Sequence, residues 1–239
     1  MMEVDPRSAA AMVVHRGHGY YFCSEICRNK FNADPNIFIG KHLAPALCVG
    51  VMGSAGSDDA EWLRQHAFRL GKEIAHQGLT LITGACPGLP YECARGAWQL
   101  GGMSIGISPA LSLDEHVHKY LSPVDAFDVL VYTGSGLMGR EVTNIRSSDM
   151  VVVLGGRSGT LGEFAIAYDE GKLIGVLKGS GGIADQLPAL VESIGKETGA
   201  LMVYESEPER LLQRMLDAYR GGHFRKPNCF CNEQIAAAG

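Results

Sequence analysis

The sequence predicts an α/β protein, a doubly wound parallel sheet of the Rossmann-like type preceded by a small cysteine-containing segment. Short continuous apolar runs, such as residues 47–53 and 149–155, are typical of strands buried on both faces. Segments with the apolar spacing of amphipathic helices alternate with these runs. Because parallel strands need right-handed crossovers, the helices are expected to cover both faces of the sheet.

The elements follow one another regularly after residue 46. Apolar runs rich in valine, leucine and isoleucine predict strands at 47–53, 79–84, 103–108, 128–133, 149–155, 173–178 and 201–204. Amphipathic spacing predicts helices at 58–78, 90–102, 138–148, 162–171, 182–195 and 207–220. The first of these helices is expected to start at an aspartate cap, and the second to stop at paired glycines. Residues 1–40 form a separate segment, 46–220 the main domain, and 221–239 a tail.

Composition excludes several functional classes. The 239 residues carry a net charge of −5, and the pI is about 5.9, so the charge disfavours nucleic acid as a partner. No run reaches the ~20 apolar residues of a membrane span, and no secretory leader is recognisable, so we expect a cytoplasmic protein without a membrane partner. Seven cysteines indicate reduced thiols or metal ligands. Cys48, Cys86 and Cys93 are expected to be small buried residues.

Three glycine-rich loops follow predicted strands, at 53–59, 83–92 and 155–163. Ligands of such sheets bind at the carboxyl ends of the strands, and free amides at a helix start suit a phosphate. Neither a G-x-G-x-x-G nor a P-loop pattern is present, which argues against dinucleotide redox chemistry and triphosphate hydrolysis. Glycines that merely form tight turns are the alternative. The candidate phosphate- and nucleotide-binding residues are Gly53, Ser54, Gly84, Gly88, Glu92, Gly156, Arg157, Ser158, Gly159 and Thr160.

Glu163 is the acidic residue of the third loop. One turn into the helix, it would face the same crevice as the amides near Thr160. It would there hydrogen-bond ribose hydroxyls or stabilise a cationic sugar in a transition state. The alternative is a favourable charge at a helix N-terminus, worth about 0.3–1 kcal/mol.

The third loop, GGRSGTLGE, together with the preceding MGREVTNIRSSD, resembles the Lonely Guy (LOG) family of nucleoside-monophosphate phosphoribohydrolases, often mislabelled as lysine decarboxylases. The family signature is P-G-G-x-G-T-x-x-E after a helix that carries M-x-x-R-K. The resemblance covers roughly residues 46–220 and implies a LOG-like Rossmann domain. It implies catalytic roles for Arg140, which would orient the substrate, and Glu163, which would assist departure of the base. It also implies a homodimer.

The signature is not matched everywhere. Gly155 stands in place of the proline, Arg157 in place of a glycine, and Glu141 in place of the lysine. The sequence therefore looks closer to a less characterised branch, in the superfamily (SLOG) that includes the DNA-processing protein DprA. Arg157 would either strengthen a phosphate clamp or plug the pocket.

The N-terminal segment resembles a truncated YHS domain, a metal-associated module with the core Y-Y-F-C-S-x-x-C. Cys23 and Cys27 match two of its cysteines, and Cys229 and Cys231 of the tail would complete a four-thiolate site for Zn or another metal. Unliganded thiols are the alternative, because both spacings are weak signals.

Two functions are compatible with these patterns. The first is hydrolysis of the N-glycosidic bond of a nucleoside 5′-monophosphate, which needs no cofactor and yields free base and ribose 5-phosphate. The second is a non-catalytic sensor of a nucleotide derivative, coupled to a metal- or redox-responsive YHS-like segment. A lysine decarboxylase would need a pyridoxal-binding lysine with a phosphate site beside it, and neither Lys172 nor Lys178 is placed in that way.

Overall fold

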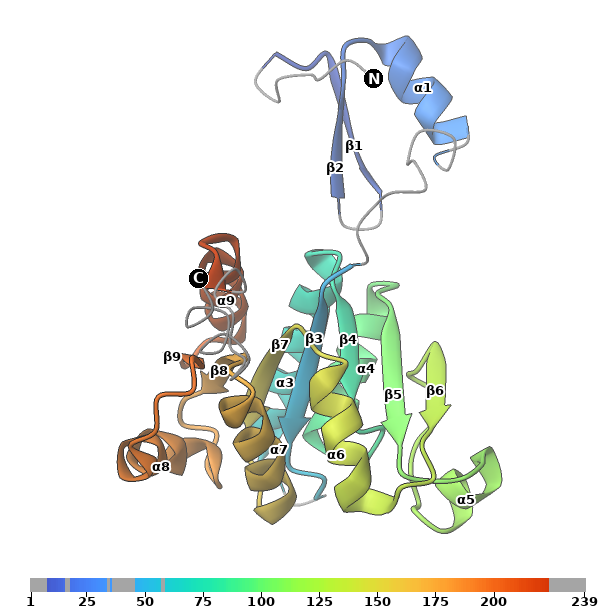
Figure 1. Cartoon of the computed structure of the whole chain (residues 1–239). Coiled ribbons are helices and arrows are strands. Elements are labelled where there is room, and N and C mark those ends of the chain that lie inside the picture. The colour runs from blue at the N-terminus through green and yellow to red at the C-terminus, as the bar shows by residue number, and fades with distance from the viewer. Residues whose placement is uncertain (1–7, 16–17, 34, 36–45, 57–58, 224–239) are drawn as a thin grey trace, which may run out of the picture.

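The computed structural model describes residues 8–15, 18–33, 35, 46–56 and 59–223. Its main feature is a seven-stranded parallel sheet in the order β6-β5-β4-β3-β7-β8-β9 (Figure 1). The strands are β3 (Cys48–Gly53), β4 (Thr80–Thr83), β5 (Ser104–Ser108), β6 (Val129–Tyr132), β7 (Met150–Leu154), β8 (Leu173–Leu177) and β9 (Leu201–Glu205). This sheet, with helices on both faces, confirms the predicted Rossmann-like fold.

The helices form two layers. They are α3 (Glu61–His76), α4 (Leu89–Gln99), α5 (Leu113–His118), α6 (Gly136–Arg146), α7 (Ser158–Asp169), α8 (Leu187–Ile194), which follows the short 3₁₀ helix η1 (Ala184–Gln186), and α9 (Pro208–Arg220). Helices α3, α4 and α9 share one apolar cluster with the sheet, and α6, α7 and α8 share the other. In Figure 1, α6 and α7 lie in front of the sheet and α3 and α4 behind it.

The strand sequences explain the two layers. Successive side chains of a strand point to opposite faces, so Val152 packs with α3 and α4 while Val151 and Val153 pack with α6 and α7. All five residues of β7 are buried, as a continuous apolar run between two helix layers predicts.

The strand order reverses next to β3. From β3 the chain proceeds through β4 and β5 to β6, and then returns to place β7 on the other side of β3. Gly53 at the end of β3 pairs with Leu154 at the end of β7. This reversal is a topological switch point, and ligands of such sheets bind outside the carboxyl ends of the two strands that flank it, here β3 and β7.

Some boundaries differ from the sequence-based expectation. Helix α7 begins at Ser158, four residues earlier than expected, so the glycine-rich loop is shorter and its end is helical. Helix α3 has Ala60 at its N-cap and no side-chain cap, so the expected aspartate cap was wrong. Helix α5 was not expected. Strand β6 lies at the sheet edge and is mostly exposed, whereas its apolar run indicated a buried strand.

The described part of the N-terminal segment is an antiparallel hairpin, β1 (Ala11–His15) and β2 (His18–Phe22), followed by α1 (Glu25–Ala33). Phe31 of α1 is buried, with its ring 4.7 Å from that of Tyr20 and 5.2 Å from that of Phe22. None of the helices in the described ranges combines the length and apolarity needed to cross a membrane.

Candidate functional site

The loops at the switch point contact one another. The Thr160 hydroxyl at the start of α7 donates to the Gly53 carbonyl at the end of β3, at 3.2 Å. The Leu89 amide at the start of α4 donates to the Ser54 carbonyl, at 2.8 Å. A Cβ on Gly88 would lie 2.3 Å from that same carbonyl, so only glycine permits this close approach. The predicted loops after β3, β4 and β7 therefore form one continuous rim.

The loop between β7 and α7 is held in a conformation that only glycine adopts readily. Gly155 and Gly156 have φ values of +57° and +90°. The Gly155 amide donates to the Ser180 hydroxyl at 2.9 Å, and the Gly156 carbonyl accepts from the Ile183 amide at 3.0 Å. The chain then enters α7 with Arg157, Ser158 and Gly159 exposed. First-turn amides have no acceptor within their own helix, so this end of α7 suits an anion.

Arg140 and Glu163 meet between α6 and α7. Arg140 Nη1 donates to Glu163 Oε1 at 3.1 Å, and the two residues are 7% and 6% exposed. Asn144, one turn after Arg140 on α6, donates from Nδ2 to the same oxygen at 3.1 Å and is fully buried. The structure thus brings together the two residues with predicted catalytic roles and adds Asn144, which the sequence reading missed.

The backbone that follows β4 packs against the Arg140 guanidinium. A Cβ on Gly84 would lie 2.0 Å from Arg140 Nη1, so the guanidinium occupies the space that any side chain at this position would fill. Ala85 follows with φ at +50°, and its amide donates to the Thr83 hydroxyl at 3.1 Å. The Cys86 thiol interacts with Arg140, and burial raises the pKa of that thiol. Cys86 is therefore part of the site rather than only a small core residue.

Burial controls the charge of Glu163. Removal from water raises the pKa of its carboxyl to about 7, against the opposing effects of the Arg140 charge and the Asn144 hydrogen bond. The neighbouring Glu141 carboxylate raises this pKa further. Glu163 consequently changes its charge near neutral pH, which is the range in which a general acid or base works best.

Glu141 is a second buried carboxyl in the same place. It is 6% exposed, and burial raises its pKa while the Arg140 charge lowers it. Its side chain lies along α7, where a Cβ on Gly162 would be 2.7 Å from Glu141 Oε2. Its carboxylate has no hydrogen bond or ion pair with the described residues. The glycine at position 162 is the sequence signal that leaves room for this side chain.

Two further polar atoms of this cluster lack a partner among the residues that the structure describes. They are Nε of Arg140 and Oδ1 of Asn144, and both are buried. An unpaired buried polar atom costs about 1–3 kcal/mol, so the cluster is locally unfavourable and has to be held in place by the packing around it.

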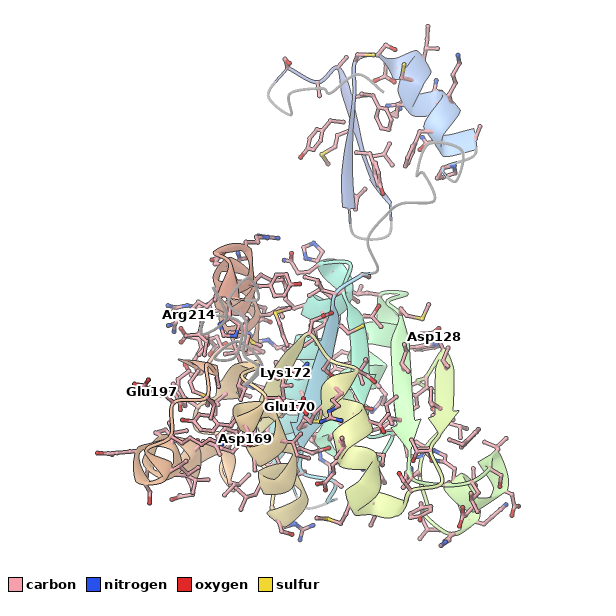
Figure 2. The ribbon with its side chains drawn as sticks, viewed as in Figure 1. Asp128, Asp169, Glu170, Lys172, Glu197 and Arg214 are labelled. Carbon is pink, nitrogen blue, oxygen red and sulfur yellow. The ribbon has the colours of Figure 1, made fainter. Side chains whose placement is uncertain are left out.

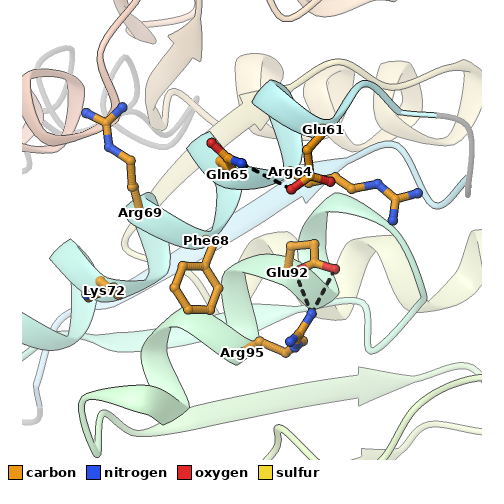
Figure 3. A pocket seen from close by; sticks show the side chains of 8 residues that line it. All are labelled: Glu61, Arg64, Gln65, Phe68, Arg69, Lys72, Glu92 and Arg95. Atoms are coloured by element: carbon orange, nitrogen blue, oxygen red, sulfur yellow. Dashed lines mark hydrogen bonds and ion pairs between the residues drawn. The ribbon is translucent and has the colours of Figure 1, made fainter.

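Glu92 lies elsewhere, on the outer face of α3 and α4. It pairs with Arg95 at 3.0 Å and lines an open hollow of about 510 Å³ (Figure 3). The other lining residues are Glu61, Arg64, Gln65, Phe68, Arg69 and Lys72. None of the residues of the Arg140 cluster lines this hollow. The Arg140 cluster is the better candidate site, because it brings a guanidinium and two buried carboxyls together at the carboxyl edge of the sheet, whereas Glu92 in the hollow is partly exposed to solvent and paired with Arg95.

Polar residues at the opposite edge of the sheet have structural roles. Asp149, which directly precedes β7, accepts from the Cys48 amide at 2.7 Å and so ties β7 to β3. Lys172 precedes β8 and donates to the Ser148 carbonyl at 2.7 Å; Figure 2 labels it together with Asp128 near the amino ends of the strands. Lys172 therefore lies at the wrong edge for a pyridoxal-binding lysine at the switch point.

The predicted metal ligands are only partly described. The Cys23 and Cys27 sulfurs are 3.7 Å apart, one turn from each other at the start of α1. Cys229 and Cys231 lie outside the described residues. Within the described ranges, no group of three or more histidine, cysteine or acidic residues is arranged to hold a metal ion. The four-cysteine site stays a prediction.

Comparisons with known proteins concern mainly the Rossmann-like domain. The model of the SLOG cluster4 family matches residues 46–212. An uncharacterized protein of Archaeoglobus fulgidus is 37% identical over 130 residues, which are 54% of this chain and 79% of that protein. The crystal structure of TM1055 is 25% identical, with a TM-score of 0.64, over 72% of this chain and 99% of that one. The molybdenum cofactor binding protein from Rippkaea orientalis is 27% identical, with a TM-score of 0.61, over 74% and 99%.

The charges around Glu163 lead to a test of the cluster. Arg140→Met should raise the pKa of Glu163 above its value of about 7, because the positive charge of Arg140 lowers it. Glu141→Gln should lower that pKa, because a like charge is removed. Carbon-detected NMR titration of the glutamate carboxyls measures both shifts, with Glu92→Gln as a control that leaves the pKa unchanged. Identical titration curves in all four proteins would contradict the described packing.

Proposed function

We propose that this chain, which belongs to the SLOG cluster4 family, binds a phosphorylated small molecule at the switch point and hydrolyses the N-glycosidic bond of a nucleoside 5′-monophosphate. The observation that carries the proposal is the buried Arg140–Glu163 pair beside the open first turn of α7. The first turn of α7 supplies hydrogen-bond donors for the phosphate. The Arg140–Glu163 pair supplies charged groups beside the glycosidic bond that breaks. Membership of this family supports the superfamily expected from the sequence; LOG-type activity belongs to the proposal.

The phosphate is assigned to the start of α7. Arg157, Ser158 and Gly159 at this helix start are exposed. The positive end of the helix dipole favours an anion there by about 0.3–1 kcal/mol, and each hydrogen bond to a charged group adds about 1.5–3 kcal/mol. Because Arg157 is exposed, it is free to act as a phosphate clamp rather than a plug.

The pentose is assigned to the space over Arg140 and Glu163. As the bond from C1′ to the base breaks, positive charge develops on the sugar, and the ionised Glu163 carboxylate stabilises it. Arg140 orients the carboxylate through its 3.1 Å hydrogen bond. Water adds its hydroxyl to C1′ and its remaining proton goes to the departing base, so the products are ribose 5-phosphate and free base.

A second candidate function is non-catalytic binding of a phosphorylated heterocycle. Two observations favour it: Arg140 and Glu163 are already paired with each other, and one structural relative is described as a molybdenum cofactor binding protein. A carrier or sensor needs only a binding rim, without turnover. Release of base therefore separates the two functions.

Hydrolysis is tested with a panel of nucleoside 5′-monophosphates and chromatography of the released base. Glu163→Gln should lower the rate about 10²–10³-fold, because it removes the charge that stabilises the transition state. Glu92→Gln is the matched control and should leave the rate unchanged, because Glu92 lies in the hollow on α3 and α4. Tight binding of a nucleotide without release of base would favour the carrier, and absence of binding would contradict both functions.

We also propose a homodimer that uses the β6 edge of the sheet together with the start of α6. Val129 and Val131 of the edge strand β6 are 45% and 40% exposed, and Leu137 and Met138 at the start of α6 are 56% and 70% exposed. An exposed edge strand with apolar side chains is a ready surface for a partner. Since α6 also carries Arg140, the partner would border the active site.

Light scattering tests the dimer. The chain should have twice its mass of 25.6 kDa at micromolar concentration, and Met138→Glu should shift it toward 25.6 kDa because a buried interface disfavours an unpaired charge. Trp98→Glu, at a comparably exposed apolar residue on α4, should leave the dimer intact. A wild-type mass of 25.6 kDa would refute the assembly.

A further inference from the structure

We infer that Glu141 is a specificity-determining residue whose carboxylate accepts hydrogen bonds from the vicinal hydroxyls of the ligand's pentose, so that the site selects ribose over 2-deoxyribose. The inference rests on the proposed function and goes beyond it by assigning a role to a residue that departs from the LOG signature. It concerns the sugar alone and is independent of the identity of the base.

The first support is the unpartnered state of this carboxylate. Glu141 is only 6% exposed, yet it has no hydrogen bond or ion pair with the described residues. Charged groups in such positions are costly unless they are paired, and structures retain them where they perform a task. A group that donates hydrogen bonds to it would remove the cost.

The second support is its place in the cluster. Glu141 precedes the turn of α6 that carries Asn144, and its carboxylate lies against the first two turns of α7, 3.6 Å from where a Cβ on Gly159 would be. It is close enough to Glu163 to raise the pKa of that residue. In the proposed function Glu163 faces C1′, and the neighbouring carbon C2′ carries the first of the two hydroxyls.

The charge and shape of the Glu141 carboxylate suit the sugar of the ligand and not its phosphate. The carboxylate would repel the phosphate, which has the same charge. Its two oxygens accept two donors side by side, and a vicinal diol provides this pair; acidic side chains bind ribose hydroxyls in this way in Rossmann folds. A resident metal ion would need more ligands than this place offers, since no metal-holding cluster exists among the described residues.

The test compares ribose 5-phosphate with 2-deoxyribose 5-phosphate by titration calorimetry, because neither contains a bond that the enzyme would cleave. The wild type should bind the ribose compound about tenfold more tightly or better, as expected for a hydrogen bond to a charged group. Glu141→Gln should bring the two affinities to within about threefold. Glu92→Gln should keep the wild-type ratio, and a purely structural role of Glu141 would weaken both ligands without changing the ratio.

The other outcomes are distinct. If both sugars bind the wild type equally, the inference is overturned while the proposed function survives, since phosphate binding and Glu163 do not depend on it. If neither binds, both are overturned. The titrations are repeated with EDTA and then with excess Mg²⁺ to test whether a bound cation causes the selectivity. If the selectivity for ribose disappears with EDTA, Glu141 is a metal ligand and the inference is overturned.

Discussion

The buried ion pair between Arg140 and Glu163 is the interaction on which the rest of the site depends. Arg140 reaches Glu163 only because Gly84 has no side chain, and Glu163 is held by a second bond from Asn144. One guanidinium therefore lies between three parts of the chain: α6, which carries it, α7, with which it pairs, and the backbone that follows β4. Removing one partner of such a pair costs about 3–5 kcal/mol, because the other charge is left buried and unpaired.

Burial outweighs pairing at this site. The pKa of Glu163 is raised to about 7, although Arg140 and Asn144 both act to lower it. Around pH 7 the carboxyl therefore exists in both charge states in comparable amounts. Glu141 adds a second carboxyl to the cluster, which therefore holds two carboxyls and one guanidinium. A ligand that donates hydrogen bonds to these carboxyls would lower the cost of burying their negative charge, which gives the cluster a physical reason to bind a polyhydroxylated molecule.

Much of this arrangement follows from the sequence. Apolar runs predicted the sheet, and glycines after three strands predicted the rim at its carboxyl edge. The partnership of Arg140 and Glu163 was implied by resemblance to the LOG signature and not by their spacing of 23 residues. Asn144 could have been found, because it is four residues from Arg140 on one face of a helix. Glu92 and Glu141 could not be placed, because the direction of a helical side chain depends on how the helices pack: the first points to the α3–α4 hollow, and the second into the space left by Gly162.

The central claim is that this cluster and the first turn of α7 together form one ligand site. A crystal structure with ribose 5-phosphate tests it most directly. The account predicts that the phosphate contacts the first-turn amides of α7 and that the sugar lies within hydrogen-bond distance of the Arg140 and Glu163 side chains. A sugar phosphate seated instead in the α3–α4 hollow, against Arg64 and Arg95, with the Arg140 cluster unchanged, would contradict it.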